Sequence, residues 1–288
     1  MNTFICNILD FNFHELEEKE NLNLDQLCEM ILEHEFSSES ALTLFRNISR
    51  YRYLVEEDYS SIINRLFPVL SLCLHDPELI CTAANTSDLF LLRFLLDLDV
   101  DPSVENNTPL NLACYNGYID LVRLLLRDPR VFNPLNTTSD LGQTRVFNKL
   151  SVKSKALIFT CRATRNLDTE YNEILEMLLQ SFTYTSSQLS KAFSWACRSV
   201  RTDLAFRITQ EPEFDLSICY SVCENNLEIL CCCANDEYLE HLEKLLTLML
   251  PRIDDIFANT NFKKCTDSLS GLKSKRPLEI LLSAIPEK

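Results

Sequence analysis

Glycine is nearly absent from this sequence. The 288 residues include three glycines, Gly117, Gly142 and Gly271, which lie far apart. Loops that cradle phosphates or dinucleotides are built on closely spaced glycines, so the common nucleotide-binding enzymes are excluded. Tight β-hairpins also rely on glycine, because few other residues adopt positive φ angles at low cost. The shortage disfavours sandwiches and barrels and predicts an all-α protein.

Positive charge is scarce as well. The chain has 27 lysines and arginines against 42 aspartates and glutamates, a net charge of −15 and a pI of about 4.7. A molecule of this charge repels nucleic acid and anionic membranes. The sequence also lacks a basic stretch near Met1 and an apolar run of the ~18 residues that a membrane span needs. We therefore expect neither nucleic acid nor a membrane as a partner.

Cysteine, in contrast, is abundant. The thirteen cysteines come without an export signal, whereas disulfide frameworks form in oxidising compartments. The simplest interpretation is a set of free thiols in a reducing, intracellular compartment. The predicted location is the cytoplasm or the nucleus.

The N-terminal part of the chain is acidic and has helical periodicity. Residues 1–39 hold ten acidic side chains against one lysine, and so supply −9 of the net charge of −15. Apolar residues recur up to residue 66 at the spacing of amphipathic helices. The three groups are Leu24, Leu27, Cys28 and Ile31, then Ala41, Leu44, Phe45 and Ile48, then Tyr59, Ile62, Ile63 and Leu66. We interpret residues 1–72 as a helical segment that acts as a cap or as a docking module.

From about residue 77 the sequence repeats itself. Leu91–Leu96 (LLRFLL) recurs thirty residues later as Leu121–Leu126 (LVRLLL). A shift of 83 residues brings three further matches into register, which are Ala113-Cys114 on Ala196-Cys197, Asp120-Leu121 on Asp203-Leu204, and Pro129 on Pro212. A helical pattern with a period near 30 indicates a solenoid, whose units bury their apolar faces by stacking on their neighbours.

The unit at residues 107–131, NTPLNLACYNGYIDLVRLLLRDPRV, resembles an ankyrin repeat. It has the family's Thr-Pro-Leu opening, small inner residue, inter-helix glycine and triple-leucine helix, at Thr108, Pro109, Leu110, Ala113, Gly117, Leu124, Leu125 and Leu126. Asn111 and Tyr118 replace two family histidines, and Cys114 replaces the second alanine. The resemblance implies a solenoid of ankyrin-type helix pairs at residues 73–288. The expected units are 77–102, 103–135, 136–184, 185–216 and 217–258, with a C-terminal cap at 259–288.

Two further patterns accompany the repeats. Amphipathic helices are predicted around Leu242, Leu245, Leu246 and Met249, and around Leu278, Leu281, Leu282 and Ile285. Asp-Pro steps occur at Asp76, Asp101 and Asp128. We expect each step to end a helix and begin an extended connector, because proline disfavours the α conformation in the residue before it. In this style the array is similar to the degenerate ankyrin arrays of giant DNA viruses of amoebae, which would place it in a host cell's cytoplasm.

The resemblance also implies a concave binding surface, lined by the inner helices and the connectors of the stack. The partner-binding residues expected in the best unit are Val104, Glu105, Asn107, Tyr115 and Asn116, and those at corresponding positions of neighbouring units are Asn85, Thr86, Arg162, Arg198 and Ser199. Tyr115 is the expected anchor, because a tyrosine is large and stiff and can donate a hydrogen bond.

One stretch departs from the acidic background. Between Asp140 and Asp168 the chain carries six basic residues and no acidic one, and these are Arg145, Lys149, Lys153, Lys155, Arg162 and Arg165. Three interpretations of this basic island stay open: a solvated loop, a docking site for an acidic protein surface such as the chain's own N-terminal segment, and a weak nucleic-acid contact.

The cysteines fall into two groups. Cys114, Cys161 and Cys197 occupy one repeated inner-helix position where ankyrin repeats prefer alanine, which predicts that they pack in the core. The cysteines between residues 219 and 233 could supply thiolates to a metal, or a nucleophile with His241 as its base. Their spacing matches no usual metal motif.

The sequence thus predicts a non-enzymatic, monomeric module that binds another protein, as an adaptor or a competitor, with no metal or other cofactor. The alternative is a thiol- or metal-dependent enzyme that uses the cysteine-rich region 219–233.

Overall fold

The computed structural model describes residues 28–29, 31–51, 59–132, 152–163, 168–199, 201–215, 231, 239–249 and 262–284. Within these ranges every regular element is a helix and no strand occurs, so the predicted all-α class is confirmed. The chain divides into a first unit, residues 1–113 with 120–141, and a second unit, residues 114–119 with 142–288.

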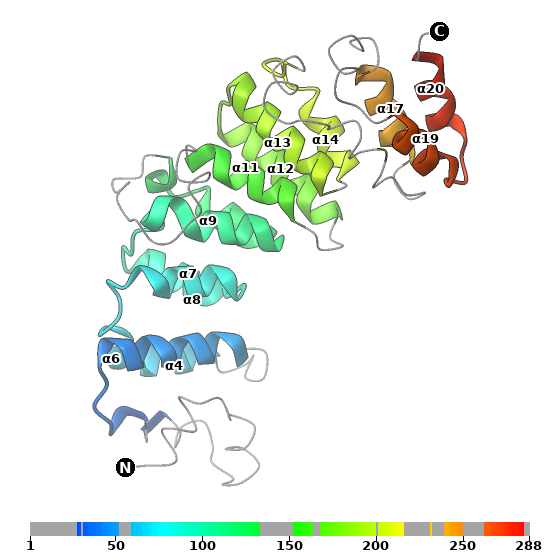
Figure 1. Cartoon of the computed structure of the whole chain (residues 1–288). Coiled ribbons are helices and arrows are strands. Elements are labelled where there is room, and N and C mark those ends of the chain that lie inside the picture. Colours follow the sequence, from blue (N-terminus) through cyan, green and yellow to red (C-terminus); the bar gives the residue numbers. More distant parts are fainter. Residues whose placement is uncertain are drawn as a thin grey trace. The chain divides into compact units, whose positions relative to one another are not determined.

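The helices of the first unit follow one another at short intervals (Figure 1). They are α4 (Ser38–Tyr51), α5 (Tyr59–Arg65), α6 (Phe67–Leu70), α7 (Pro77–Asn85), α8 (Leu89–Asp97), α9 (Val104–Asn116), α10 (Ile119–Leu125) and the 3-10 turn η2 (Pro129–Val131). The last residues of α9 and the first of α10 belong to the second unit.

The core of the first unit lies between α4, α7 and α8. Helix α7 packs against both α4 and α8. The apolar groups predicted from periodicity are buried at Ala41, Leu44, Phe45, Ile48, Tyr59, Ile62, Ile63 and Leu66. Of the group at residues 24–31, Cys28 and Ile31 are buried, and the other two lie outside the described residues. Helical periodicity therefore located the buried face of these helices.

Asp76 and Asp128 are N-caps of the helical turns that follow them. Both have extended backbone, with ψ of 118° and 119°. Their carboxylates accept hydrogen bonds from the backbone N–H of Glu78 and Arg130, each at 2.9 Å. The following proline sits in the first turn, where its missing N–H leaves no partner unsatisfied. The extended backbone of these aspartates was predicted correctly, but the expected extended connector was wrong, because a helical turn begins at each proline.

Three consecutive residues at the start of α9, Glu105–Asn107, have left-handed φ angles of 50°, 62° and 60°. This conformation costs roughly 1–2 kcal/mol for most non-glycine residues and less for asparagine. Hydrogen bonds from the side chains of Asn107, Thr108 and Asn111 to backbone carbonyl oxygens oppose that cost, at 2.6, 2.8 and 3.3 Å. The Asn107 bond reaches the carbonyl oxygen of Val131.

The second unit contains α11 (Val152–Arg162), α12 (Asp168–Ser181), α13 (Ser186–Arg198), α14 (Thr202–Ile208), α17 (Leu239–Met249), α19 (Phe262–Ser270) and α20 (Arg276–Ala284). Helix α11 pairs with α12 and α13 with α14, while α11 also packs against α13 and α12 against α14. Inner helices thus stack on inner helices and outer on outer, which is the arrangement of a helix-pair solenoid. Helix α17 contacts α14 and α20, and α20 contacts α19.

The predicted C-terminal helices are present. Leu242, Leu245, Leu246 and Met249 are buried on α17, as the periodicity predicts. On α20 Leu281 is buried but Leu282 is 51% exposed. The periodicity was therefore right for α17 and assigned Leu282 to the wrong face of α20. The expected boundaries of the repeats, and the division at residue 72, stay predictions.

Polar contacts tie neighbouring helix pairs together at the spacing of one repeat. In the first unit they join Arg46 to Glu78, Tyr59 to Asp88 and Asp99 to Arg130, at separations of 32, 29 and 31 residues. In the second unit they join Asn172 to Asp203 and Glu176 to Arg207, both 31 residues apart. The period found in the sequence is therefore also the period of the tertiary contacts.

Replacing Leu125 by alanine tests the stacking of α10. Leu125 is fully buried, so the Leu125→Ala variant should lose about 2–5 kcal/mol of unfolding free energy. Urea denaturation followed by circular dichroism measures the loss. Leu98→Ala is the matched control, because Leu98 is 37% exposed. Equal stability of the two variants would mean that Leu125 is not buried.

Acid should weaken the contact between Asp128 and Arg130. The hydrogen bond from the Arg130 side chain is the main reason that the pKa of Asp128 lies below its ordinary value. A lowered pKa in the folded state means stability that is present at neutral pH and is lost as the pH falls through that pKa. Asp128→Asn keeps a capping side chain but removes the charge, so its stability should fall less between pH ~5 and ~2, by about 0.2–1 kcal/mol. The measurement is urea denaturation at several pH values. If the unfolding free energies of wild type and Asp128→Asn fall equally with pH, the Asp128 carboxylate does not contribute to stability through Arg130.

Candidate functional site

Seven of the ten predicted partner-binding residues lie at or next to the C-terminal ends of helices, and the other three lie at the start of α9. Asn85 ends α7 and Thr86 is its C-cap. Tyr115 is near the end of α9, Arg162 ends α11 and Arg198 ends α13. Asn85, Tyr115, Arg162 and Arg198 are exposed, and Thr86 is partly exposed. The repeat predicts that these residues occupy the same position in successive units. In the structure each of them lies at or near the C-terminal end of its helix.

Two of the predicted residues are not surface residues. Asn107 is fully buried, where its Nδ2 atom donates to the Val131 carbonyl oxygen at 2.6 Å, and Asn116 is only 5% exposed. The expectation that these two side chains face a partner was wrong, because both are buried; at Asn107 the side-chain amide is used in a hydrogen bond to the backbone. Val104 and Glu105 are partly exposed. Ser199, the C-cap of α13, is also partly exposed.

In the second unit the structure brings three of the predicted residues together with two that sequence reasoning missed. The Arg162 guanidinium carbon lies 5.2 Å from the centroid of the Trp195 ring, and that of Arg198 lies 5.7 Å from it. The Tyr115 and Phe159 rings meet edge to face, with centroids 6.0 Å apart and an interplanar angle of 85°. We call these five residues the Trp195 cluster.

Helix geometry explains how the cluster is assembled. Phe159 precedes Arg162 by three residues on α11, and Trp195 precedes Arg198 by three residues on α13. Residues at i and i+3 share a helix face, and α11 packs directly against α13. The sequence contained the signal for the missed residues, because Phe159 and Trp195 both stand two residues before a repeated buried cysteine.

A network of buried polar contacts connects the helices that carry the cluster with their neighbours. The hydroxyl group of Tyr171, a fully buried residue of α12, donates to the Tyr115 backbone carbonyl oxygen at 2.8 Å. The Arg201 guanidinium lies over the Tyr171 ring at 4.9 Å and pairs with Asp203 at 3.0 Å. Asn172 donates to the same Asp203 at 2.9 Å. These contacts connect α12 with the start of α14 and with the end of α9 within the second unit.

The three repeated cysteines lie on the buried faces of the inner helices α9, α11 and α13. Cys114, Cys161 and Cys197 are fully buried, which confirms that they pack in the core. Burial raises the pKa of the Cys114 thiol to about 12 and raises that of Cys161 further still. The cysteines that the structure describes are free thiols, and all of them are buried. Such thiols are inert, since the reactive thiolate is disfavoured away from water.

The basic island does not form a single exposed surface. Lys155 lies on α11 and is buried, and burial lowers its pKa. Its assignment to an exposed island was therefore wrong, whereas Arg162 is exposed in the Trp195 cluster. Arg145, Lys149 and Arg165 lie outside the described residues, and of Lys153 only the backbone is described.

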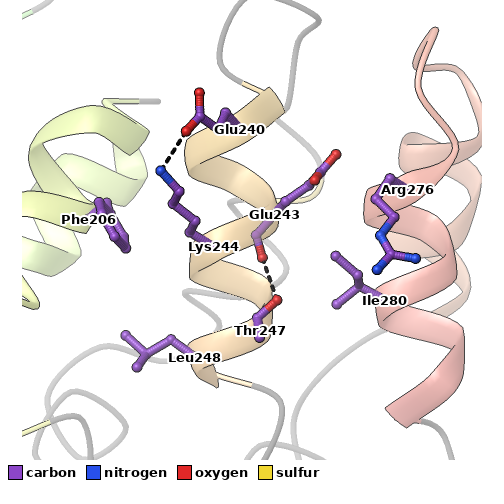
Figure 2. A pocket seen from close by; sticks show the side chains of 8 residues that line it. All are labelled: Phe206, Glu240, Glu243, Lys244, Thr247, Leu248, Arg276 and Ile280. Atoms are coloured by element: carbon purple, nitrogen blue, oxygen red, sulfur yellow. Dashed lines mark hydrogen bonds and ion pairs between the residues drawn. The ribbon is translucent and has the colours of Figure 1, made fainter.

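A shallow groove of about 500 Å³ lies between α14, α17 and α20 in the second unit. Figure 2 shows Phe206 on one side, Arg276 and Ile280 on the other, and α17 between them. Lys244 pairs with Glu240 and its Nζ atom lies 5.3 Å from the Phe206 centroid. The lining has charges of both signs and contains no cysteine or histidine. No predicted site residue lines it.

Metal chemistry and membrane insertion find no support in the part of the chain that the structure covers. There, no group of three or more His, Cys, Asp or Glu side chains is arranged to hold a metal ion. No described helix is long and apolar enough to cross a bilayer. Cys219, Cys223, Cys232 and Cys233 lie outside the described residues, and Cys231 is buried.

Comparison with known protein families finds a match to part of the chain. Residues 52–135 match the family described as ankyrin repeats, in three copies. The matched stretch starts before residue 73, where we expect the array to begin, and it ends before α11. Neither the curated proteins nor the solved structures provide a match to this chain.

Thiol labelling tests the burial of the inner-helix cysteines. Burial raises the pKa of both Cys81 and Cys114 to about 12, so iodoacetamide at pH ~8 should leave them unmodified in the folded protein. Peptide mapping by mass spectrometry should show modification of both only after unfolding in urea. Rapid labelling of Cys114 in the folded protein would show that the inner helices do not enclose it.

Proposed function

Starting from the ankyrin repeats at residues 52–135, we propose that this chain is a non-enzymatic module that binds a partner protein through the inner-helix ends of its stack. The Trp195 cluster is the centre of that binding surface. The mechanism is surface complementarity on a preformed scaffold, and it involves no bond chemistry and no cofactor. The module acts as an adaptor or a competitor, as a monomer, in the cytoplasm or the nucleus.

The single observation that supports this function most strongly is the composition of the cluster. Tryptophan, tyrosine and arginine are the residues that carry most binding energy in protein interfaces. The only tryptophan of the chain is partly exposed and has two exposed arginines over its ring. Tyr115, which contacts Phe159, is 38% exposed. Aromatic residues left partly open on a rigid platform lose little conformational entropy when a partner covers them.

The family provides a second line of support. Ankyrin repeats generally mediate protein–protein interactions and are typically non-enzymatic. The part of the chain that the structure describes adds no specific support to the alternative of a thiol- or metal-dependent enzyme at residues 219–233, because its thiols are buried and its acidic groups do not cluster around a metal site.

Affinity capture with a folded double variant tests the proposal. Tyr115→Ala/Trp195→Ala removes two partly exposed rings, so the melting temperature should change by only about 2–4 °C. Capture from a cell lysate, quantified by mass spectrometry, should lose the specific partner by about tenfold or more.

The matched control is Leu248→Ala/Arg276→Ala, which removes two exposed side chains from the groove in Figure 2. It should retain the partner. If the control loses the partner and the Tyr115→Ala/Trp195→Ala variant keeps it, the binding surface is the groove and the proposal is wrong.

A further inference from the structure

The Trp195 cluster holds two positive charges close together. Arg162 and Arg198 belong to neighbouring inner helices, yet both guanidinium groups lie over one indole ring, at 5.2 and 5.7 Å from its centroid. The two guanidinium carbons are therefore at most about 11 Å apart, and both charges raise the positive electrostatic potential over the same patch of surface. An anionic segment that reaches both guanidinium groups is attracted by this potential and gains charge-assisted hydrogen bonds from each.

The contact with the indole leaves arginine well suited to bind an anion. A cation–π contact attracts the guanidinium charge to the face of the ring and does not require its N–H donors. The planar fork of donors matches a carboxylate or a phosphate in a bidentate manner. Both arginine side chains are exposed, so an incoming group reaches them without displacing the helices.

Apolar surface lies next to the charged part of the cluster. The Tyr115 and Phe159 rings meet edge to face, and Phe159 stands one helical turn before Arg162. A segment that fills the whole cluster therefore needs anionic side chains beside an aromatic or aliphatic side chain. All five cluster residues are basic or aromatic, whereas the whole chain has a net charge of −15.

From these contacts we infer that the Trp195 cluster binds an acidic linear segment of the partner, with its carboxylates on Arg162 and Arg198 and an apolar side chain against Tyr115 and Phe159. The inference rests on the proposed function, because it names the chemistry of the partner at the same surface. A basic partner would be repelled by the paired arginines and attracted to the acidic remainder of the chain.

Selection of peptides on the intact chain tests this chemistry without knowledge of the partner. Random linear peptides displayed on phage are selected on the folded protein, and an enriched peptide is then measured by fluorescence anisotropy. We expect enriched peptides with clustered aspartate or glutamate beside an apolar residue. Arg162→Gln/Arg198→Gln should weaken binding by about tenfold or more.

The matched control is Arg93→Gln/Arg127→Gln, which removes two exposed arginines of the first unit and so changes the net charge equally. It should change the affinity by less than about twofold. Replacing the carboxylates of the peptide by amides should weaken binding to the wild type but have little further effect on Arg162→Gln/Arg198→Gln, because the two changes remove the same contact.

The outcomes separate this inference from the proposed function. Enriched peptides that are neutral or basic, or that bind Arg162→Gln/Arg198→Gln as tightly as wild type, would overturn the inference; if they still require Tyr115 and Trp195, the proposed function stands. Peptides that bind only when the acidic residues are replaced by phosphoserine would assign the arginines to phosphate and overturn the carboxylate assignment. An absence of enrichment, or binding indifferent to Tyr115→Ala/Trp195→Ala, would count against both.

Discussion

Close approach of successive inner helices is the constraint on which this structure depends. A single helix pair has too little apolar surface to bury by itself, so each pair is stable only when its inner helix lies against the next. The inner helices carry small side chains such as Ala83, Cys114 and Ala196, all fully buried. Cysteine adds slightly more volume and polarisability than alanine at the same place. The cysteines that the structure describes thus serve the packing of the helices.

Scarcity of glycine is the second feature that shapes the molecule. A solenoid of helix pairs needs sharp reversals, and this chain makes them with aspartate, serine and asparagine. Ser87 and Asp99 each adopt a φ of 62°, as Glu105–Asn107 adopt left-handed angles in succession. At two of these positions a side-chain hydrogen bond is formed: Asp99 accepts one from Arg130, and Asn107 donates one to the Val131 carbonyl oxygen. Asn107 is buried although asparagine is a polar residue, because its side-chain amide has a hydrogen-bond acceptor in the Val131 carbonyl oxygen.

The helices were predictable because their periodicity reports burial directly. Leu44, Phe45 and Leu245 are buried where the pattern placed them, and the repeat offset located Arg162 and Arg198 at equivalent helix ends. The sequence could not show that α11 and α13 bring both arginines onto Trp195, since that depends on the distance and rotation between two helices. Burial of Lys155 also escaped prediction, because charge counting along a segment ignores which face of the helix each residue occupies.

The spacing of the polar ties between helix pairs has a consequence for how the chain folds. Because these contacts join residues only 29 to 32 positions apart, the loops that must close before a tie can form are short. Low contact order favours rapid folding, and it removes the need for any one region to act as the nucleus. Folding can start at any pair of neighbouring repeats and then extend to the repeats on either side. Insertion or removal of one repeat therefore changes the length of the chain, while each remaining repeat keeps the same kind of contact with its neighbours.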